Sequence, residues 1–352
     1  MKKLILAMCT ASLLFSCTDD DSLSTNSAPV ADNNGIEVVE VSNGNVVQGT
    51  RTLGDGELAL KFDSEASFQK FKNELLNESS FARTETISKY GIKNLYDLAD
   101  DADAELEKIG NEATSLSDFN AKYSEYKKKY EGLLITDASD NSDVSLYVPN
   151  ADSPESYIAN KNGYFVVGNE VRKISVNSEN YPNYPSLPST PGQKVPSQEG
   201  TVAGTNKVEL RPRSNTKIYF EAYAQGYYLR VKMSAKKHMW YGWKNDPHRQ
   251  YFFDSYLDNN FVYLGQGKYG QEAIVNRLPR YIFNNEKAVK NGFDIILGKR
   301  QTAAKFTGEF HVWSDLTSEH DKDGNDITEK VGNFVMPKCL ESKAQIVKID
   351  IL

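Results

Sequence analysis

The spacing of apolar residues predicts three amphipathic helices in the first half of the chain. Apolar side chains recur every three or four positions there, which places them on one face of a helix. The positions are Phe68, Phe71, Leu75 and Leu76, then Leu95, Leu98, Ala99, Ala102, Leu106 and Ile109, and then Phe119, Tyr123, Tyr126 and Tyr130. Asp63 or Ser64 is suited to cap the first helix, and Gly110 is suited to end the second. We interpret the aromatic stripe of the third helix as core rather than as a platform for a ligand.

The pattern changes to a period of two in other parts of the chain, which predicts strands. Gly168-Asn169 separates two β-rich runs within residues 153–176 and suits a two-residue hairpin turn. Gln225-Gly226 suits a second hairpin turn. Residues 272–291 are compatible with a short helix or a long crossing loop. Further along, one face of each predicted strand is apolar, at Ile218, Phe220 and Ala222, at Leu229, Val231 and Met233, and at Phe306, Phe310 and Val312.

These patterns predict an α+β protein. Its N-terminal helical region carries a small antiparallel sheet, and its C-terminal region is an antiparallel β-sandwich. Residues 177–200 contain five prolines and two glycines, a composition that favours an extended spacer between domains. The predicted divisions are a signal peptide at 1–16, a lipid anchor and flexible tether at 17–55, a helical α+β domain at 56–176, a Pro-rich linker at 177–205 and the β-sandwich domain at 206–352.

Charge divides at the same place. Residues 1–205 contain 18 Lys and Arg against 31 Asp and Glu, a net charge of −13. Residues 206–352 contain 23 against 17, a net charge of +6, and the two values sum to the −7 of the whole chain. This asymmetry indicates either two separately evolved surfaces or two halves that attract each other.

The N-terminus has the pattern of an export signal. Lys2 and Lys3 precede an apolar run of about a dozen residues, which is shorter than the roughly 20 residues that span a bilayer. Leu14-Phe15-Ser16-Cys17 is similar to the lipobox of bacterial lipoproteins. The resemblance implies that Cys17 carries palmitate and becomes the mature N-terminus; the alternative is an ordinary signal peptide with a chance cysteine. Only Cys339 would then remain, so no intramolecular disulfide is expected.

Three aspartates follow the cysteine. Asp19, Asp20 and Asp21 resemble the acidic export signal of surface-exposed Bacteroidetes lipoproteins. The resemblance implies a protein anchored in the outer membrane by lipid and facing the extracellular side. The alternative is that these aspartates merely solvate a tether.

Two segments of the N-terminal half and the predicted hairpin carry a wider resemblance. The segments "FDSEASFQKFKNEL" and "GIKNLYDLADDADAELEKI", followed by the hairpin of residues 153–176, resemble a group of Bacteroidetes lipoproteins catalogued only as a domain of unknown function. The resemblance covers about residues 1–176. It implies a cellular location and an architecture but no activity. The matching positions are Gly91, Asn94, Leu95 and Tyr96, then Ala159, Asn162, Gly163 and Gly168.

The sequence shows no recognisable catalytic motif, and we expect no cofactor. The four histidines, His238, His248, His311 and His320, form no pair with the spacing of a zinc site. "HDKDGNDITEK" matches an EF-hand loop only in part, because aligning Gly324 places Lys330 where a bidentate glutamate is required. We interpret Asp323-Gly324 as the tip of a hairpin. A pair of carboxylates for glycoside hydrolysis is not identifiable by sequence spacing alone.

One stretch, residues 227–256, combines aromatic and basic side chains. Aromatic faces stack on sugar rings, and nearby cations hold acidic groups or add cation–π attraction. The alternative is that the rings fill the core while the cations solvate its rim. The candidate ligand-binding residues are Trp240, Tyr241, Trp243, Arg230, Lys232, Lys237 and Arg249.

The function that these patterns favour is non-catalytic binding at the cell surface, by a lipid-anchored protein whose C-terminal β-domain takes a glycan or an extracellular protein. No nucleic acid is expected as a partner at that location. The alternatives are a structural subunit of a surface assembly, or a hydrolase without a recognisable motif. Two or more exposed, coplanar aromatics near charges would indicate a binder. A cleft with convergent carboxylates would indicate a hydrolase, and an exposed, incomplete sheet edge would indicate a structural subunit.

Overall fold

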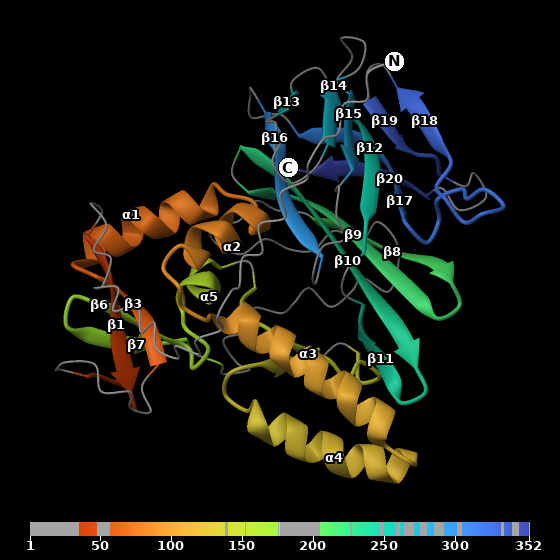
Figure 1. The fold of residues 1–352 in the computed structure, drawn as a ribbon. Helices are drawn as coiled ribbons and strands as arrows, with labels where there is room; N and C mark the ends of the chain where they lie inside the picture. Colours follow the sequence, from red (N-terminus) through yellow and green to blue (C-terminus); the bar gives the residue numbers. More distant parts are fainter. Residues whose placement is uncertain are drawn as a thin grey trace, which may run out of the picture.

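The structure is a computed structural model and confirms an α+β protein in which helices are concentrated in the N-terminal part and strands in the C-terminal part (Figure 1). The signal peptide, Cys17, the three aspartates and residues 177–204 of the predicted linker lie outside the described residues. The structure describes residues 35–47, 57–137, 140–151, 153–174, 176, 205–225, 227–246, 249–257, 261–263, 271–274, 280–284, 292–300, 305–331, 334–339 and 345–351.

The N-terminal sheet is mixed rather than purely antiparallel. Its order is β2-β1-β3-β6-β7, and β3 pairs with β6 in parallel while the other pairs are antiparallel. The strands are β1 (Ile36–Ser42), β2 (Asn45–Val46), β3 (Glu57–Phe62), β6 (Tyr164–Val167) and β7 (Glu170–Lys173). Val167 pairs with Glu170, so the predicted hairpin turn at Gly168-Asn169 is confirmed.

The strands β1 and β2 lie within residues 17–55, which the sequence predicted as tether. Ile36 faces the main N-terminal core, whereas Val41 of the same strand packs with Ala59 and Val166 on the other face of the sheet. A strand with apolar contacts on both faces does not alternate cleanly between apolar and polar residues, and this explains why the period-two pattern was not evident.

The three predicted helices are confirmed. The described residues of the N-terminal part also contain two shorter helices. Ser64 caps α1 by accepting a hydrogen bond from the amide of Ser67, and Asn94 caps α3 in the same way. The aromatic stripe of α4 is core as predicted, since Phe119, Tyr126 and Tyr130 are buried. The helices are α1 (Glu65–Leu76), α2 (Ser80–Ser88), α3 (Leu95–Glu112), α4 (Leu116–Lys129) and α5 (Pro154–Ile158).

Gly110 does not end its helix, because α3 continues to Glu112. A Cβ atom built on Gly110 would lie 2.2 Å from Cε1 of Tyr241, a residue of the C-terminal part. The ring of Tyr241 stacks on Phe119 of α4, with centroids 4.4 Å apart. The glycine therefore admits a ring from the other part of the chain into the helical core.

The C-terminal part contains two larger sheets, ordered β13-β16-β10-β9-β8, with β11 attached to β10, and β14-β15-β12-β17-β20. Gln225 pairs with Tyr228, which confirms the hairpin between β9 and β10. The strands are β8 (Thr205–Arg213), β9 (Thr216–Gln225), β10 (Tyr228–Met239), β11 (Gly242–Asn245), β12 (Tyr251–Leu257), β13 (Phe261–Tyr263), β14 (Gln271–Ile274), β15 (Arg280–Asn284), β16 (Phe293–Arg300), β17 (Phe306–Ser314) and β20 (Gln345–Ile351).

The two sheets share one apolar core. Phe220 of β9 contacts Phe310 of β17 with ring centroids 4.9 Å apart, and Phe253 of β12 at 6.4 Å. The alternation that predicted these strands is confirmed, since all nine of the apolar positions named for them are buried in this core. The described residues within 272–291 belong to the antiparallel pair β14 and β15, so the expectation of a helix or a long loop there was wrong.

Smaller elements complete the described chain, namely the pair β4 (Ile135–Thr136) and β5 (Leu146–Tyr147) and the pair β18 (Thr328–Val331) and β19 (Phe334–Pro337). Gly324 adopts a positive φ of 85° between His320 and Asp326, which form a β-bridge, so the hairpin tip is confirmed. Partial burial raises the pKa of the Cys339 thiol to about 11. Within the described part of the chain, no helix is both long and apolar enough to cross a membrane.

The packing at Gly110 makes a first prediction. Gly110→Ala adds a methyl group where the Tyr241 ring already lies, so we expect a loss of about 1–3 kcal/mol in the free energy of unfolding. This loss should appear in urea denaturation although alanine favours a helix by about 1 kcal/mol over glycine. Asn111→Ala, on the exposed side of the same helix, is the control and should change little. Equal stability of the two variants would contradict the packing described here.

Candidate functional site

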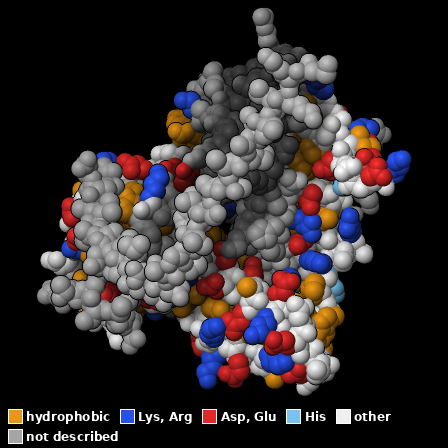
Figure 2. Space-filling model, viewed as in Figure 1, with side chains coloured by type: hydrophobic (Ala, Val, Ile, Leu, Met, Phe, Trp, Pro, Cys, Tyr) orange, Lys and Arg blue, Asp and Glu red, His pale blue; other side chains and the backbone are white. Residues whose placement is uncertain are grey.

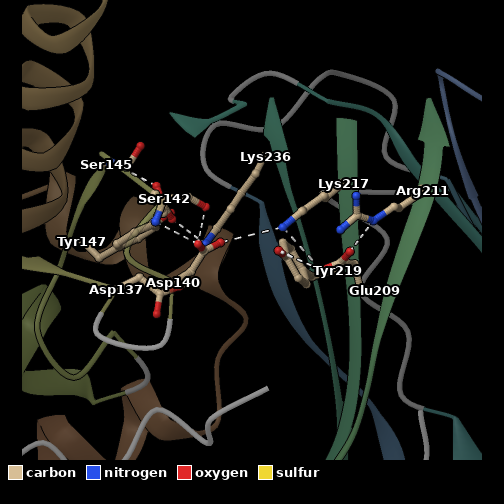
Figure 3. A network of polar contacts seen from close by, with 11 residues as sticks. Asp137, Asp140, Ser142, Ser145, Tyr147, Glu209, Arg211, Lys217, Tyr219 and Lys236 are labelled. Atoms are coloured by element: carbon tan, nitrogen blue, oxygen red, sulfur yellow. Dashed lines mark hydrogen bonds and ion pairs between the residues drawn. The ribbon is translucent and has the colours of Figure 1, made fainter. Parts of the chain in front are cut away.

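A network of charged side chains lies where the N-terminal part meets β8, β9 and β10 (Figure 3). The backbone of the segment around Ser142 runs alongside β11: Trp243 N donates to Ser142 O at 2.8 Å, and Val144 N donates to Trp243 O at 2.8 Å. Gly242 permits this approach, because a Cβ atom on it would lie 2.7 Å from Ser142 O. The segment thus acts as an added strand, and it brings its acidic side chains to the basic side chains of β9 and β10.

Lys236 and Asp143 form the centre of this network. The Lys236 ammonium contacts the Asp143 carboxylate directly and lies 3.0 Å from Oδ2 of Asp137. The Asp143 side chain is wholly buried and also accepts hydrogen bonds from Ser145 N at 3.0 Å and from the Tyr147 hydroxyl at 2.7 Å. Burial by itself lowers the pKa of Lys236, but the two carboxylates outweigh burial and raise it, so the lysine is charged.

Aromatic rings surround the same cation. The Lys236 ammonium lies 5.5 Å from the ring centroids of both Tyr147 and Tyr219. Burial, and then the negative charge of Asp143, raises the pKa of Tyr147 well above its ordinary value. Tyr147 therefore remains a protonated phenol that donates to the carboxylate.

A second cation, Lys217 of β9, extends the network toward β8. Its ammonium lies 3.7 Å from both Asp140 and Glu209 and 4.4 Å from the ring centroid of Trp243. Arg211 donates to Glu209 at 2.7 Å on the outer side. The backbone of Trp243 is therefore bonded to Ser142 and Val144, while its ring contacts the Lys217 ammonium.

The third group of contacts joins α3 to β11. Lys244 lies 3.2 Å from Glu107, and the Asn245 side chain donates to Asp103 at 3.0 Å. Burial raises the pKa of Asp103 to about 6, and the contacts with Asn245 and Lys244 only partly offset this effect.

A separate contact joins the two parts at the C-terminal end of α1. Arg230 of β10 forms a bidentate ion pair with Asp294, at 3.0 and 3.1 Å, and donates to the backbone oxygens of Leu76 and Glu78, both at 3.0 Å. Arg83 donates to Leu75 O at 2.7 Å. Two arginines therefore meet carbonyls at the negative end of the α1 dipole, where cations are stabilising.

This arrangement is suited to joining the two parts rather than to catalysis. Every cation and carboxylate named here contacts a partner within the protein, and the central pair is withdrawn from solvent. Among the residues that the structure describes, no group of three or more His, Cys, Asp or Glu is placed to hold a metal ion. In the region of α3 and α4, acidic and basic side chains are intermingled on the surface (Figure 2).

The structure distributes the seven predicted ligand-binding residues among different environments. Arg230, Tyr241 and Trp243 are buried in contacts with the N-terminal part or with neighbouring strands, so they are unsuited to binding a ligand at the surface. Their burial follows from the docking of the two parts, which the period of the strands did not reveal.

The remaining four residues differ in exposure. Lys232 is half-buried, with its ammonium 4.7 Å from the Tyr223 ring, and Arg249 is held between Asp246 and Asp315. Lys237 is half-buried and belongs to the same β10–β11 hairpin as Trp240. Trp240 retains 53% of its surface exposed. Only Trp240 among the predicted aromatic residues therefore presents a ring to solvent.

Comparison with known proteins shows that the N-terminal part is similar to a family of unknown function. Residues 52–186 match the family model described as "Domain of unknown function (DUF4848)". The chain is also similar to the crystal structure of a DUF4848 family protein from Bacteroides thetaiotaomicron VPI-5482, at 17% identity and a TM-score of 0.30, covering 84% of this chain and 97% of that one. No curated protein matches the chain. The resemblance to a Bacteroidetes group of unknown function is confirmed.

The central ion pair makes a second prediction. Asp143→Asn leaves the buried Lys236 ammonium with Asp137 as its remaining carboxylate, so we expect a loss on the order of 3 kcal/mol in the free energy of unfolding. Asp350→Asn removes an exposed carboxylate paired with Lys305 and should cost less than about 1 kcal/mol. Urea denaturation of both variants measures the difference. The double variant Lys236→Met, Asp143→Asn should recover most of the loss, because it removes the unpaired ammonium while an amide oxygen at position 143 can still accept from Ser145 N and the Tyr147 hydroxyl. A harmless Asp143→Asn would show that the pair contributes nothing.

The shifted acid at α3 makes a third prediction, which concerns pH. A carboxyl with a raised pKa favours the folded state while it is protonated, and this contribution is lost as pH rises from 3.8 through about 6. A shift of this size corresponds to at most about 3 kcal/mol, and solvent near the half-buried side chain reduces the effect.

Asp103→Asn keeps the shape of the side chain without the charge. At pH 7 we expect it to raise the free energy of unfolding by an amount on the order of 1 kcal/mol, and the melting temperature with it. Near pH 4 the variant should be as stable as the parent. Thermal unfolding followed by circular dichroism across this range measures the difference. A variant that is less stable than the parent at pH 7 would show that ionised Asp103 stabilises the fold.

Proposed function

We propose that this protein is anchored by lipid in the outer membrane, faces the extracellular side and binds a glycan or an extracellular protein there without catalysis. Its Cys17 carries the lipid, and Asp19, Asp20 and Asp21 direct the chain to the surface. The lipobox-like N-terminus supports the anchor, and the match of residues 52–186 to a family found in Bacteroides supports the comparison with surface lipoproteins of that group.

The observation that carries the binding role is the exposure of the Trp240 ring at a turn where the neighbouring aromatic residues Tyr241 and Trp243 are buried. A ligand that covers the exposed part of the indole gains free energy, because burial of apolar surface is favourable. On the same hairpin, Lys236 and Lys244 contact carboxylates within the protein, and this favours binding over acid–base chemistry. The two C-terminal sheets form the β-sandwich that presents the site, a proposal supported by the contact between Phe220 and Phe310.

The location makes a fourth prediction. In cells labelled with palmitate, Cys17→Ala should lose the label and leave the membrane fraction or stay unprocessed. Replacing Asp19, Asp20 and Asp21 by alanine should keep the label but reduce digestion by protease added to intact cells. Thr18→Ala is the matched control, and it should change neither the labelling nor the digestion. Equal labelling of Cys17→Ala and the parent would exclude the proposed anchor.

Binding is tested with the purified mature protein on arrays of glycans and of extracellular proteins. Retention of at least one ligand supports the proposed role. Absence of binding on both arrays, with surface location intact, would favour the structural-subunit alternative.

A further inference from the structure

We infer that Trp240 is a stacking platform for one pyranose ring of an extracellular polysaccharide. This inference rests on the proposed function, since it assigns the ligand class and the place at which that ligand binds. It depends on three observations, namely how the indole is held, how isolated it is among exposed apolar side chains, and which parts of the chain meet beneath it.

The indole of Trp240 is held by its surroundings. Trp240 and Tyr241 form the two-residue turn between β10 and β11, where Met239 pairs with Gly242. Tyr241 is directed into the helical core, against Gly110 and Phe119. The Trp240 ring stands at 85° to Tyr241 and at 68° to Phe119, with centroids 5.3 and 5.8 Å away. A ring placed in this way before binding loses little conformational freedom when a ligand stacks on it.

The exposed indole is nearly isolated, and this favours a small ligand face. Among the described residues, the exposed large hydrophobic side chains are Val47, Leu116, Tyr227, Trp240, Ile327, Val335 and Ile346. They belong to separate elements, and Leu116 alone shares α4 with the Phe119 ring that supports Trp240. Hydrophobic side chains reach the surface where α4 and the β11 hairpin meet (Figure 2).

A patch of this kind suits a sugar better than a protein surface or a membrane. A stable protein interface buries about 800 Å² on each partner around an apolar centre, which one indole and one leucine do not supply. A pyranose ring has one apolar face that matches an indole and a rim of hydroxyl groups that need polar neighbours. Exposed His238 and half-buried Lys237, two and three residues before Trp240, provide polar groups on the same hairpin.

The platform exists only where the two parts of the chain meet. Trp240 comes from the C-terminal part, while Phe119 and Leu116 come from α4 of the N-terminal part. Lys236, four residues before Trp240 on β10, forms the buried pair with Asp143. The contact that joins the parts therefore also fixes the position of the platform.

The tryptophans of this chain allow a direct test. The sequence has three, and Trp243 and Trp313 are only 9% and 5% exposed, against 53% for Trp240. Quenching of fluorescence by acrylamide should therefore report mainly on Trp240. The probes are a neutral β-glucan, a galactomannan, polygalacturonate and chondroitin sulfate, each titrated into the full mature protein. A tryptophan-free protein and anionic lipid vesicles are the comparison probes.

At least one polysaccharide should shift the emission to shorter wavelength and reduce acrylamide quenching. Isothermal titration calorimetry measures binding by the variants, because a Trp240 variant lacks the fluorescent reporter. Trp240→Ala should weaken binding of that polysaccharide about tenfold or more, the loss expected for one aromatic stack, and Trp240→Phe should weaken it less. Tyr227→Ala is the matched control, because Tyr227 is also an exposed aromatic residue at a hairpin and lies at the other end of β10. That control should bind as the parent does, and an unchanged circular dichroism spectrum shows that the variants fold.

Three results would overturn the inference. One is that no polysaccharide protects Trp240, and another is that a polysaccharide binds Trp240→Ala as tightly as the parent. The third is that only vesicles or a protein shift the emission, which would reassign the indole to a membrane or a protein partner. In each case, surface location and ligand retention on the arrays would still decide the proposed function separately.

Discussion

The ion pair between Lys236 and Asp143 is the interaction on which the relation between the two parts depends. Removing two charges from water is costly, and such a pair is tolerated when its geometry is good and its remaining hydrogen-bonding groups are satisfied. Here Ser145 and Tyr147 satisfy the carboxylate, while Asp137 adds a second negative partner for the ammonium. Because a shifted strand would leave these charges buried without partners, the pair favours one register between the segment around Ser142 and the β10–β11 hairpin.

The same complementarity explains the uneven distribution of charge along the chain. Three lysines of the basic half contact carboxylates of the acidic half. The pairs are Lys217 with Asp140, Lys236 with Asp143, and Lys244 with Glu107. Arg230 repeats the arrangement with backbone carbonyls at the end of α1 in place of carboxylates. Attraction between the halves, one of the two interpretations that the net charges allowed, is therefore visible as specific contacts.

Local pattern predicted most of the elements but not what each buried face contacts. The repeats at Phe68 and Phe119 and the alternation at Ile218 depend on neighbours a few residues away, and they were confirmed. Gly110 was misinterpreted as a helix end because its partner, Tyr241, lies 131 positions later, the difference between the two residue numbers. The charged network was missed for the same reason: Lys236 stood inside the basic–aromatic stretch, but nothing near it in sequence indicated Asp143. Of the residues predicted to bind a ligand, Trp240 kept an exposed ring because it occupies a turn.

Trp240 and Tyr241 show how one turn can serve both packing and recognition. The two residues of a two-residue turn can project in different directions, so one turn can carry both an inward ring and an outward ring. Tyr241 fills the space left by Gly110 and stacks on Phe119, which fixes the turn against the helices. Trp240 then takes its orientation from a turn that packs against the helices at the edge of a core. The buried contacts that join the two halves thus provide the rigid support that an exposed aromatic ring needs if it is to bind with little loss of entropy.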